Sequence, residues 1–393
     1  MSYLLSSVAF VHKSTKHALI AISVIFVISL SNLVLAAEKK ADQYDELGIK
    51  FQDAINSQDL QSLEGLLDIR ELAIRSARTP YDKEDDIQGF VRRYTKFGEK
   101  ALLEKVFSTV FQQDGYADYL RVIDGNKPLV RITFPEGGYE YMVFSTQVKN
   151  EQLSVVDIFM LSSGRELSVT LGAVTQLLIS PSESLIKRMF GVQEFNADLA
   201  SNLQEIVDLK TAGKYEGAYK AVQRLPEDIR NHRVLMDLAI QLSAVFDENE
   251  YVRQLSLLEK HHGNDPATTF ILIDHYFYEK NYVKAGESVD KLIERFGEDA
   301  ALLNLKSTIA YLAGQFDTAR GYAKAAIEME PYFEDAYSTL ASIYTDEKSY
   351  ARLVELLRTI EANFEFSYSK DDFVSDEFYA EFVQSKEFKD WLN

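Results

Sequence analysis

The sequence contains no cysteine and few histidines. The absence of cysteine excludes disulfide bonds, thiolate nucleophiles, cysteine-based zinc sites and a lipid anchor attached to cysteine. Two of the six histidines lie near the N-terminus, and the adjacent pair His261-His262 has no spacing that places both rings on one helical face. We therefore expect no metal site and no cofactor.

Motifs of phosphate and acyl-transfer chemistry are also missing. Neither Gly137-Gly138 nor Gly213 is followed by Lys-Ser or Lys-Thr, as a phosphate-binding loop requires. The stretch Ser162-Ser163-Gly164 lacks the strand-to-helix context of a nucleophile elbow. We assign no catalytic residue and expect a non-enzymatic protein, with an enzyme kept as the alternative considered below.

Basic residues are few compared with acidic ones. The chain has 42 Lys and Arg against 61 Asp and Glu, which gives a formal net charge of -19. Residues 1–36 contain two lysines and no acid, so their removal shifts the charge to about -21. Such a surface repels phosphate backbones, and we expect no nucleic-acid partner. Basic peptides, basic protein faces and cations stay possible partners.

Long apolar runs are confined to the N-terminus. A basic stretch precedes an apolar core over 18–30, and Val34-Leu35-Ala36 places small residues at a cleavage position. This pattern predicts a signal peptide over residues 1–36 and a secreted, periplasmic protein. The alternative is an uncleaved membrane anchor, because residues 18–37 are long enough to span a bilayer. No second apolar run follows, so we expect no stable membrane insertion after cleavage.

The C-terminal half contains a repeat of constant length. Tyr282, Phe316 and Tyr350 are separated by 34 residues each, and Gly263, Gly297 and Pro331 follow the same step. A period of this length predicts paired helices that stack on one another, because one pair cannot bury its own apolar face.

Small, aromatic and helix-breaking residues recur at fixed positions within each unit. The matching residues of the last three units are Leu272, Tyr276, Tyr282, Ala285, Val289 and Leu292, then Leu303, Ser307, Ala310, Gly314, Phe316, Ala319, Ala323, Ala326 and Pro331, then Tyr337, Leu340, Ala341, Tyr344, Tyr350, Leu353, Leu357 and Ile360. Residues 199–367 therefore resemble the tetratricopeptide repeat family. We count five units, of which two are irregular: residues 213–218 mark an upstream unit, and 247–250 replace the expected turn of the next.

The C-terminal end has the composition of a cover for such a stack. Phe378 and Phe382 are four residues apart, Ser385 can cap a helical turn, and Phe388 and Trp391 follow. We expect a capping helix within residues 370–393.

Residues 44–182 follow a different pattern, with helices before strands. Leucines at helical spacing occupy 60–67, and a second apolar helix is expected over 99–111. Aromatic and β-branched runs then predict strands at 119–123, 129–134, 139–148 and 153–161, with hairpin turns at 124–127 and 135–138. We expect an α+β domain with an antiparallel sheet, followed by an all-α tetratricopeptide solenoid.

The element order of this domain resembles the cone-shaped fold of ketosteroid isomerases and nuclear transport factor two. That resemblance implies a curved sheet that forms the wall of a pocket. Asp157, among apolar neighbours, is then a candidate general base, with Arg131 and Tyr141 across the sheet. The competing interpretation is that Asp157 accepts hydrogen bonds from the nearby backbone or from Arg131 or Tyr141. Arg165 and Glu166 are expected to be exposed in the following turn.

The tetratricopeptide resemblance also implies which residues face the concave side of the array. They are Phe270, Asp274, Phe277, Asn304, Thr308, Tyr311, Ser338, Ser342 and Thr345. Because no Lys or Arg is among them, we do not expect a clamp for a terminal carboxylate. The surface suits an extended peptide held by hydrogen bonds and ring contacts. Phe270, Phe277 and Tyr311 are equally consistent with packing between helices.

Two functions follow from these patterns. The first is a protein-protein interaction scaffold or adaptor that uses the concave helix A surface. The alternative is a small-ligand-binding or enzymatic cone-like domain with the repeats as a docking arm. A deep cavity lined by Asp157 and Tyr141 would favour the alternative, and a sheet face closed by side chains would favour the scaffold. The oligomeric state stays open.

Overall fold

The computed structural model describes residues 43–78, 81, 83–96, 106–108, 110–135, 137–149, 151–172, 197–365 and 367–392. The expected signal segment at 1–36 lies outside the described residues, as do 99–105 of an expected helix and 173–182 of the expected cone-like domain. In the parts that are described, no helix is both long and apolar enough to cross a membrane.

The N-terminal region is α+β, as expected. Its helices precede a five-stranded antiparallel sheet in which each strand pairs with the next. The named helices are α2 (Gln43–Asn56), α3 (Leu60–Leu66), α4 (Ile69–Arg78) and α5 (Glu84–Lys96). The strands are β1 (Tyr116–Ile123), β2 (Lys127–Thr133), β3 (Tyr139–Lys149), β4 (Gln152–Met160) and β5 (Arg165–Glu166). The four predicted strands and the turn at 124–127 are confirmed, residue 136 of the second predicted turn lies outside the described residues, and β5 was not expected.

Both faces of the sheet are buried, each against a different partner. On one face, Val130, Ile132 and Phe144 pack against α2, where the rings of Phe51 and Phe144 lie 4.3 Å apart. The alternate residues, among them Leu129 and Tyr141, belong to a core shared with the C-terminal helices. The period of two along each strand thus places one apolar set on each side.

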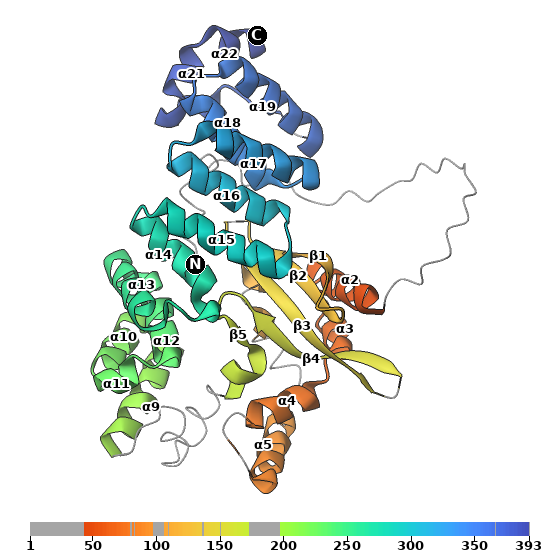
Figure 1. The fold of residues 1–393 in the computed structure, drawn as a ribbon, viewed down its shortest axis with the longest axis vertical. Helices are drawn as coiled ribbons and strands as arrows, with labels where there is room; N and C mark the ends of the chain where they lie inside the picture. The colour runs from red at the N-terminus through yellow and green to blue at the C-terminus, as the bar shows by residue number, and fades with distance from the viewer. Residues whose placement is uncertain are drawn as a thin grey trace, which may run out of the picture.

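The C-terminal region is all helical and consists of successive helix pairs within 197–364 (Figure 1). The pairs are α9 (Ala197–Thr211) with α10 (Tyr215–Gln223), α12 (Arg233–Phe246) with α13 (Glu248–His262), α14 (Thr269–Tyr278) with α15 (Tyr282–Phe296), α16 (Ala300–Leu312) with α17 (Phe316–Met329), and α18 (Glu334–Asp346) with α19 (Tyr350–Phe364). A short α11 (Glu227–Arg230) and a 3-10 turn η1 (Pro266–Thr268) lie between pairs.

The predicted 34-residue step is visible in the helix starts. Tyr282, Phe316 and Tyr350 are each the first residue of the second helix of a pair. In the irregular unit, the Asp247 side chain accepts hydrogen bonds from the backbone N–H groups of Asn249 and Glu250. Asp247 thereby caps α13, which explains how a helix pair forms without the usual turn residues.

The expected single capping helix is wrong in form. Residues 371–391 fold as α20 (Asp371–Val374), η2 (Glu377–Tyr379), α21 (Ala380–Gln384) and α22 (Lys386–Trp391). The chain restarts because Asp376 caps η2 and Ser385 caps α22 by accepting the Phe388 N–H. Phe382 and Phe388 nevertheless pack against α19, so the segment does cover the end of the helical region.

Candidate functional site

The sheet and the helix pairs meet in a buried ionic cluster, which we name the Arg131 junction. It comprises Arg131 of β2, Tyr141 of β3, Asp299 at the N-cap of α16, Glu330 after α17 and Asp118 of β1. The Arg131 guanidinium lies 3.3 Å from Asp299, 2.6 Å from Glu330 and 2.8 Å from Asp118, and its side chain is 1% exposed. The Tyr141 hydroxyl donates to Asp299 at 2.7 Å. Two distant parts of the chain are thus bound through paired charges.

The electrostatics of this junction are structural in character. Burial raises the pKa of Asp299, while the charge of Arg131 acts in the opposite direction. Burial, followed by the charge of Asp299, raises the pKa of Tyr141. Although burial disfavours the charged form of Arg131, the carboxylates of Glu330 and Asp299 raise the pKa of its guanidinium overall. Because the guanidinium stays charged, it pairs with the carboxylates of Asp299 and Glu330 at the same time and holds the sheet to the helix pairs.

Further contacts join the sheet to the loops between successive helix pairs. Tyr139 donates a hydrogen bond to Asp335 at the start of α18, and Arg233 of α12 donates to the Ser163 carbonyl at 3.3 Å. Tyr141 also stacks on Phe296 of α15 at 5.8 Å. Asp335 and Arg233 lie at the starts of first helices, and Phe296 lies at the end of a second helix. The sheet therefore covers one edge of the helical region (Figure 1).

The three residues expected to line a pocket in the sheet are all buried against other described parts of the chain. Arg131 and Tyr141 both reach Asp299, whereas Asp157 is 3% exposed and faces backbone groups. Its Oδ1 accepts the N–H of Ile158 at 2.9 Å and of Ser168 at 3.0 Å, at the start of the helical residues 167–172. Asp157 therefore has the structural role that was the competing interpretation: it anchors the chain after β5 to β4.

The turn after β4 differs from its prediction. Arg165 and Glu166 are half-buried because they form β5 against β4. Arg165 lies 3.8 Å from Asp237 of α12. Burial, followed by the charge of Asp157, raises the pKa of Glu166 to about 7. The expectation that this turn is solvent-exposed is wrong, because the turn packs beside the helical region.

The nine residues assigned to the concave side all lie on first helices of three successive pairs. Several have partners of their own: Asp274 accepts from Tyr251 at 2.7 Å, and Tyr311 donates to Asp346 at 2.5 Å. Phe277 is buried, which agrees with the packing interpretation, while Phe270 is half-buried. Serine and threonine members include Ser338, Ser342 and Thr345 of α18, where Ser342 and Thr345 bond to backbone carbonyls within the helix.

Asn304 differs from its neighbours on this surface. It lies in the middle of α16, one turn before Thr308, and its side chain is 2% exposed. Its Oδ1 atom accepts no hydrogen bond from any described residue. An unpaired buried amide oxygen destabilises a protein by about 1–3 kcal/mol, so a donor that reached this atom after a movement of the side chains around it would stabilise the protein.

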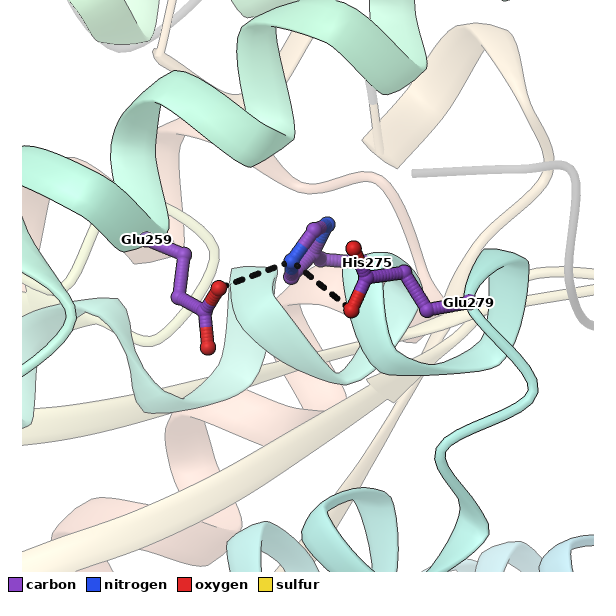
Figure 2. A group of neighbouring side chains, drawn as sticks. All are labelled: Glu259, His275 and Glu279. Carbon is purple, nitrogen blue, oxygen red and sulfur yellow. Dashed lines mark hydrogen bonds and ion pairs between the residues drawn. The ribbon is translucent and has the colours of Figure 1, made fainter.

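A second cluster was not found from the sequence. His275 of α14 is flanked by Glu259 of α13 and by Glu279, which directly follows α14 (Figure 2). Its Nε2 lies 3.1 Å from Glu259 Oε2 and 3.5 Å from Glu279 Oε2. The only local signal is a His and a Glu four residues apart on one helix. Nothing in the sequence places Glu259 beside them, because that contact depends on how α13 packs on α14.

Glu259 has a further partner and borders a hollow. The Lys284 ammonium lies 2.7 Å from Oε1, the oxygen that does not face His275, and this hydrogen bond lowers the pKa of Glu259. A cavity of about 450 Å³ adjoins the pair and is lined among others by Tyr276, Glu287 and Lys291. The carboxylate is thus ionised at neutral pH and open to solvent on one side.

Comparisons with known proteins add little. No protein-family model and no curated protein matches the chain. A solved structure described as MamA protein is 15% identical and has a TM-score of 0.34, with 43% of this chain and 96% of that chain covered. The TPR2AB domain of yeast Sti1 in complex with pHSP90 is 16% identical at a TM-score of 0.24, with 58% and 95% covered. Likenesses of this size do not place the chain in a family.

Proposed function

We propose that this chain is an exported tetratricopeptide-type scaffold that holds a segment of another protein on the first helices of its C-terminal pairs. The proposal is supported by the chain's own helix pairs, whose second helices begin at 34-residue intervals. Helix pairs of this length stack into a solenoid with an extended concave surface, which is a binding surface and not a reaction centre.

Asn304 carries the proposal. Its side-chain oxygen is buried without a partner among the described residues, and Thr308 and Tyr311 follow it by one and two turns on the same helix. Because this oxygen is buried in the free protein, a peptide reaches it only when the side chains over it move. A backbone N–H of the peptide would then satisfy the oxygen, and neighbouring hydroxyl and aromatic groups would contact the peptide side chains. The chain's acidity further favours a partner segment of neutral or basic charge.

The alternative function, a ligand-binding or catalytic cone-like domain, receives no support from the sheet. The face that bears Arg131 and Tyr141 is closed by Asp299, Phe296 and the ends of the helices. A sheet face closed by side chains is the observation that favours the scaffold over the ligand-binding or catalytic function. The cone-like resemblance and the location of the mature protein outside the cytoplasm stay proposals, the latter supported by the pattern of residues 1–36.

The test is affinity capture with the full mature chain, followed by mass spectrometry, in the extract of the compartment to which the protein is exported. We expect Asn304→Ala to reduce partner recovery at least about fivefold, since one lost hydrogen bond in a buried interface is worth roughly 1 kcal/mol or more. The free energy of unfolding should stay the same or rise, because the unpaired oxygen is removed.

Asn249→Ala is the matched control, because Asn249 is exposed on the second helix α13. Its recovery should equal that of the wild type. The paired variant Phe270→Ala and Tyr311→Ala should also lose the partner. Unchanged recovery in both groove variants would refute binding on this surface.

A further inference from the structure

We propose that Glu259, His275 and Glu279 form a binding site for a divalent transition-metal ion of the zinc type, which links α13 to α14. The site lies on helices of two successive pairs and is separate from the Arg131 junction (Figure 2). It does not depend on the proposed binding of a peptide.

The donor atoms and their spacing suit such an ion. Imidazole nitrogen and carboxylate oxygen are ordinary zinc ligands, with bonds of about 2.0–2.2 Å. A tetrahedral site with such bonds has ligand-to-ligand edges of about 3.3–3.5 Å. The observed separations from His275 Nε2 are 3.1 Å to Glu259 and 3.5 Å to Glu279, and the three ligand atoms all lie within 4.8 Å of one another. Small side-chain movements would complete the geometry.

The charges at the site are not balanced without a cation. A neutral imidazole has one N–H, and Nε2 can donate it to one of the two carboxylates. Lys284 pairs with the far oxygen of Glu259, whereas Glu279 has no ion pair with a lysine or arginine among the described residues. An ion between the three donors would be attracted to both carboxylates at once, and the high net negative charge of the chain would concentrate cations around it.

The local structure holds the ligands in place and leaves a route for the ion. His275 is fully buried, and Glu279 follows it by one helical turn, so their relative positions are fixed by α14. The side chains of Glu259 and Glu279 are 28% and 49% exposed, which gives access from solvent. The cavity of about 450 Å³ is lined by Glu259 and gives solvent access to that ligand, and a water molecule would be the fourth ligand of a tetrahedral site.

The experiment titrates the metal-free full mature chain with ZnCl₂ by calorimetry and follows Co²⁺ by its visible absorption. We expect one site whose Zn²⁺ affinity falls at least about tenfold in Glu279→Gln, because loss of an outer-shell partner alone weakens metal sites by 10–100-fold. Zn²⁺ should also raise the thermal midpoint of the wild type and not that of Glu279→Gln. Glu279 is half-exposed, so this variant is expected to fold normally.

Glu287→Gln is the matched control, because it removes one negative charge from the wall of the cavity that Glu259 also lines, without removing a ligand. Its affinity should equal that of the wild type. A second variant, His261→Asn with His262→Asn, removes the two histidines that line this cavity and should bind Zn²⁺ unchanged. The proposal is overturned by the absence of binding, by a Glu279→Gln affinity equal to that of the wild type, or by an equal loss in either control.

Discussion

At the residue scale, the role predicted for Arg131 from the sequence differs from its role in the structure. The sequence predicts Arg131 beside a pocket. In the structure Arg131 lies between the sheet and the helix pairs and contacts Asp299, which is 168 residues away in the sequence. Sequence spacing cannot reveal such a pair. We predict that Arg131→Met destabilises the protein by about 3–5 kcal/mol, because it leaves Asp299 as an uncompensated buried charge. Urea unfolding monitored by circular dichroism measures the change.

A matched surface pair provides the comparison for that prediction. Arg224 and Glu205 form an ion pair at 2.6 Å, but their side chains are 53% and 46% exposed. Exposed pairs contribute about 0–1 kcal/mol, so Arg224→Met should change the free energy of unfolding by no more than that. Equal effects of the two substitutions would show that the Arg131 junction is not a buried charge cluster.

Candidate site residues differ in how far the sequence alone could identify them. The 34-residue register assigns Asn304 to a first helix, yet nothing in the register shows that its oxygen lacks a partner. His275 and Glu279 form a recognisable pair on one helix, while Glu259 reaches them through the packing of α13 on α14. Local spacing is thus predictable, and contacts between elements need the structure.

At the scale of elements, the alternation of apolar residues and the turn residues predicted the strands correctly. The helical period did not predict how the C-terminal segment divides into short helices. Phe378 and Phe382 are four residues apart and were expected on one helical face. They end up in different elements, η2 and α21, where Phe378 is 37% exposed and Phe382 is fully buried. The first lies in a 3-10 turn and the second in an α-helix, so their four-residue spacing does not place them on one helical face.

The two phenylalanines therefore give a prediction. Phe382→Ala should destabilise the C-terminal segment by about 3–5 kcal/mol, because the ring packs against Phe373 and Phe388 in a buried cluster. Phe378→Ala should have a much smaller effect. Proteolysis of the native protein, read as the rate of cleavage after residue 364, measures local opening. If both variants were cleaved at the same rate, a continuous capping helix would describe the segment better.

At the scale of the whole molecule, the sheet and the helix pairs form one body. A single hydrophobic cluster runs from Leu129 and Tyr141 of the sheet through Phe296 to Phe333 and Ala336 of the helices. The sequence predicts two domains because the strand and helix patterns change between residues 161 and 199. It does not predict that the sheet packs on the helix pairs, because apolar residues on both faces of a sheet do not show which element covers each face.

A buried carboxylate in the sheet makes stability depend on pH. Glu140 of β3 is buried, and its Oε1 accepts the N–H groups of Tyr141 and Ser162, both at 3.0 Å. Burial raises its pKa from the ordinary 4.5 to about 7, although the hydrogen bonds lower it in part. Between these two values the folded protein binds more protons than the unfolded chain. The free energy of unfolding therefore falls as pH rises from 4.5 through about 7.

We predict that the wild type loses stability between pH 5 and pH 8 and that Glu140→Gln removes much of this loss. The glutamine carbonyl still accepts both N–H groups but carries no charge, so the variant should gain up to about 3 kcal/mol at pH 8 and little at pH 5. Urea unfolding at the two pH values measures this. Glu151→Gln, in the exposed β3–β4 turn, is the control and should keep the slope of the wild type. A slope in Glu140→Gln as steep as that of the wild type would assign the pH dependence to other carboxylates, of which half-buried Glu166, with its pKa also near 7, is the next to replace.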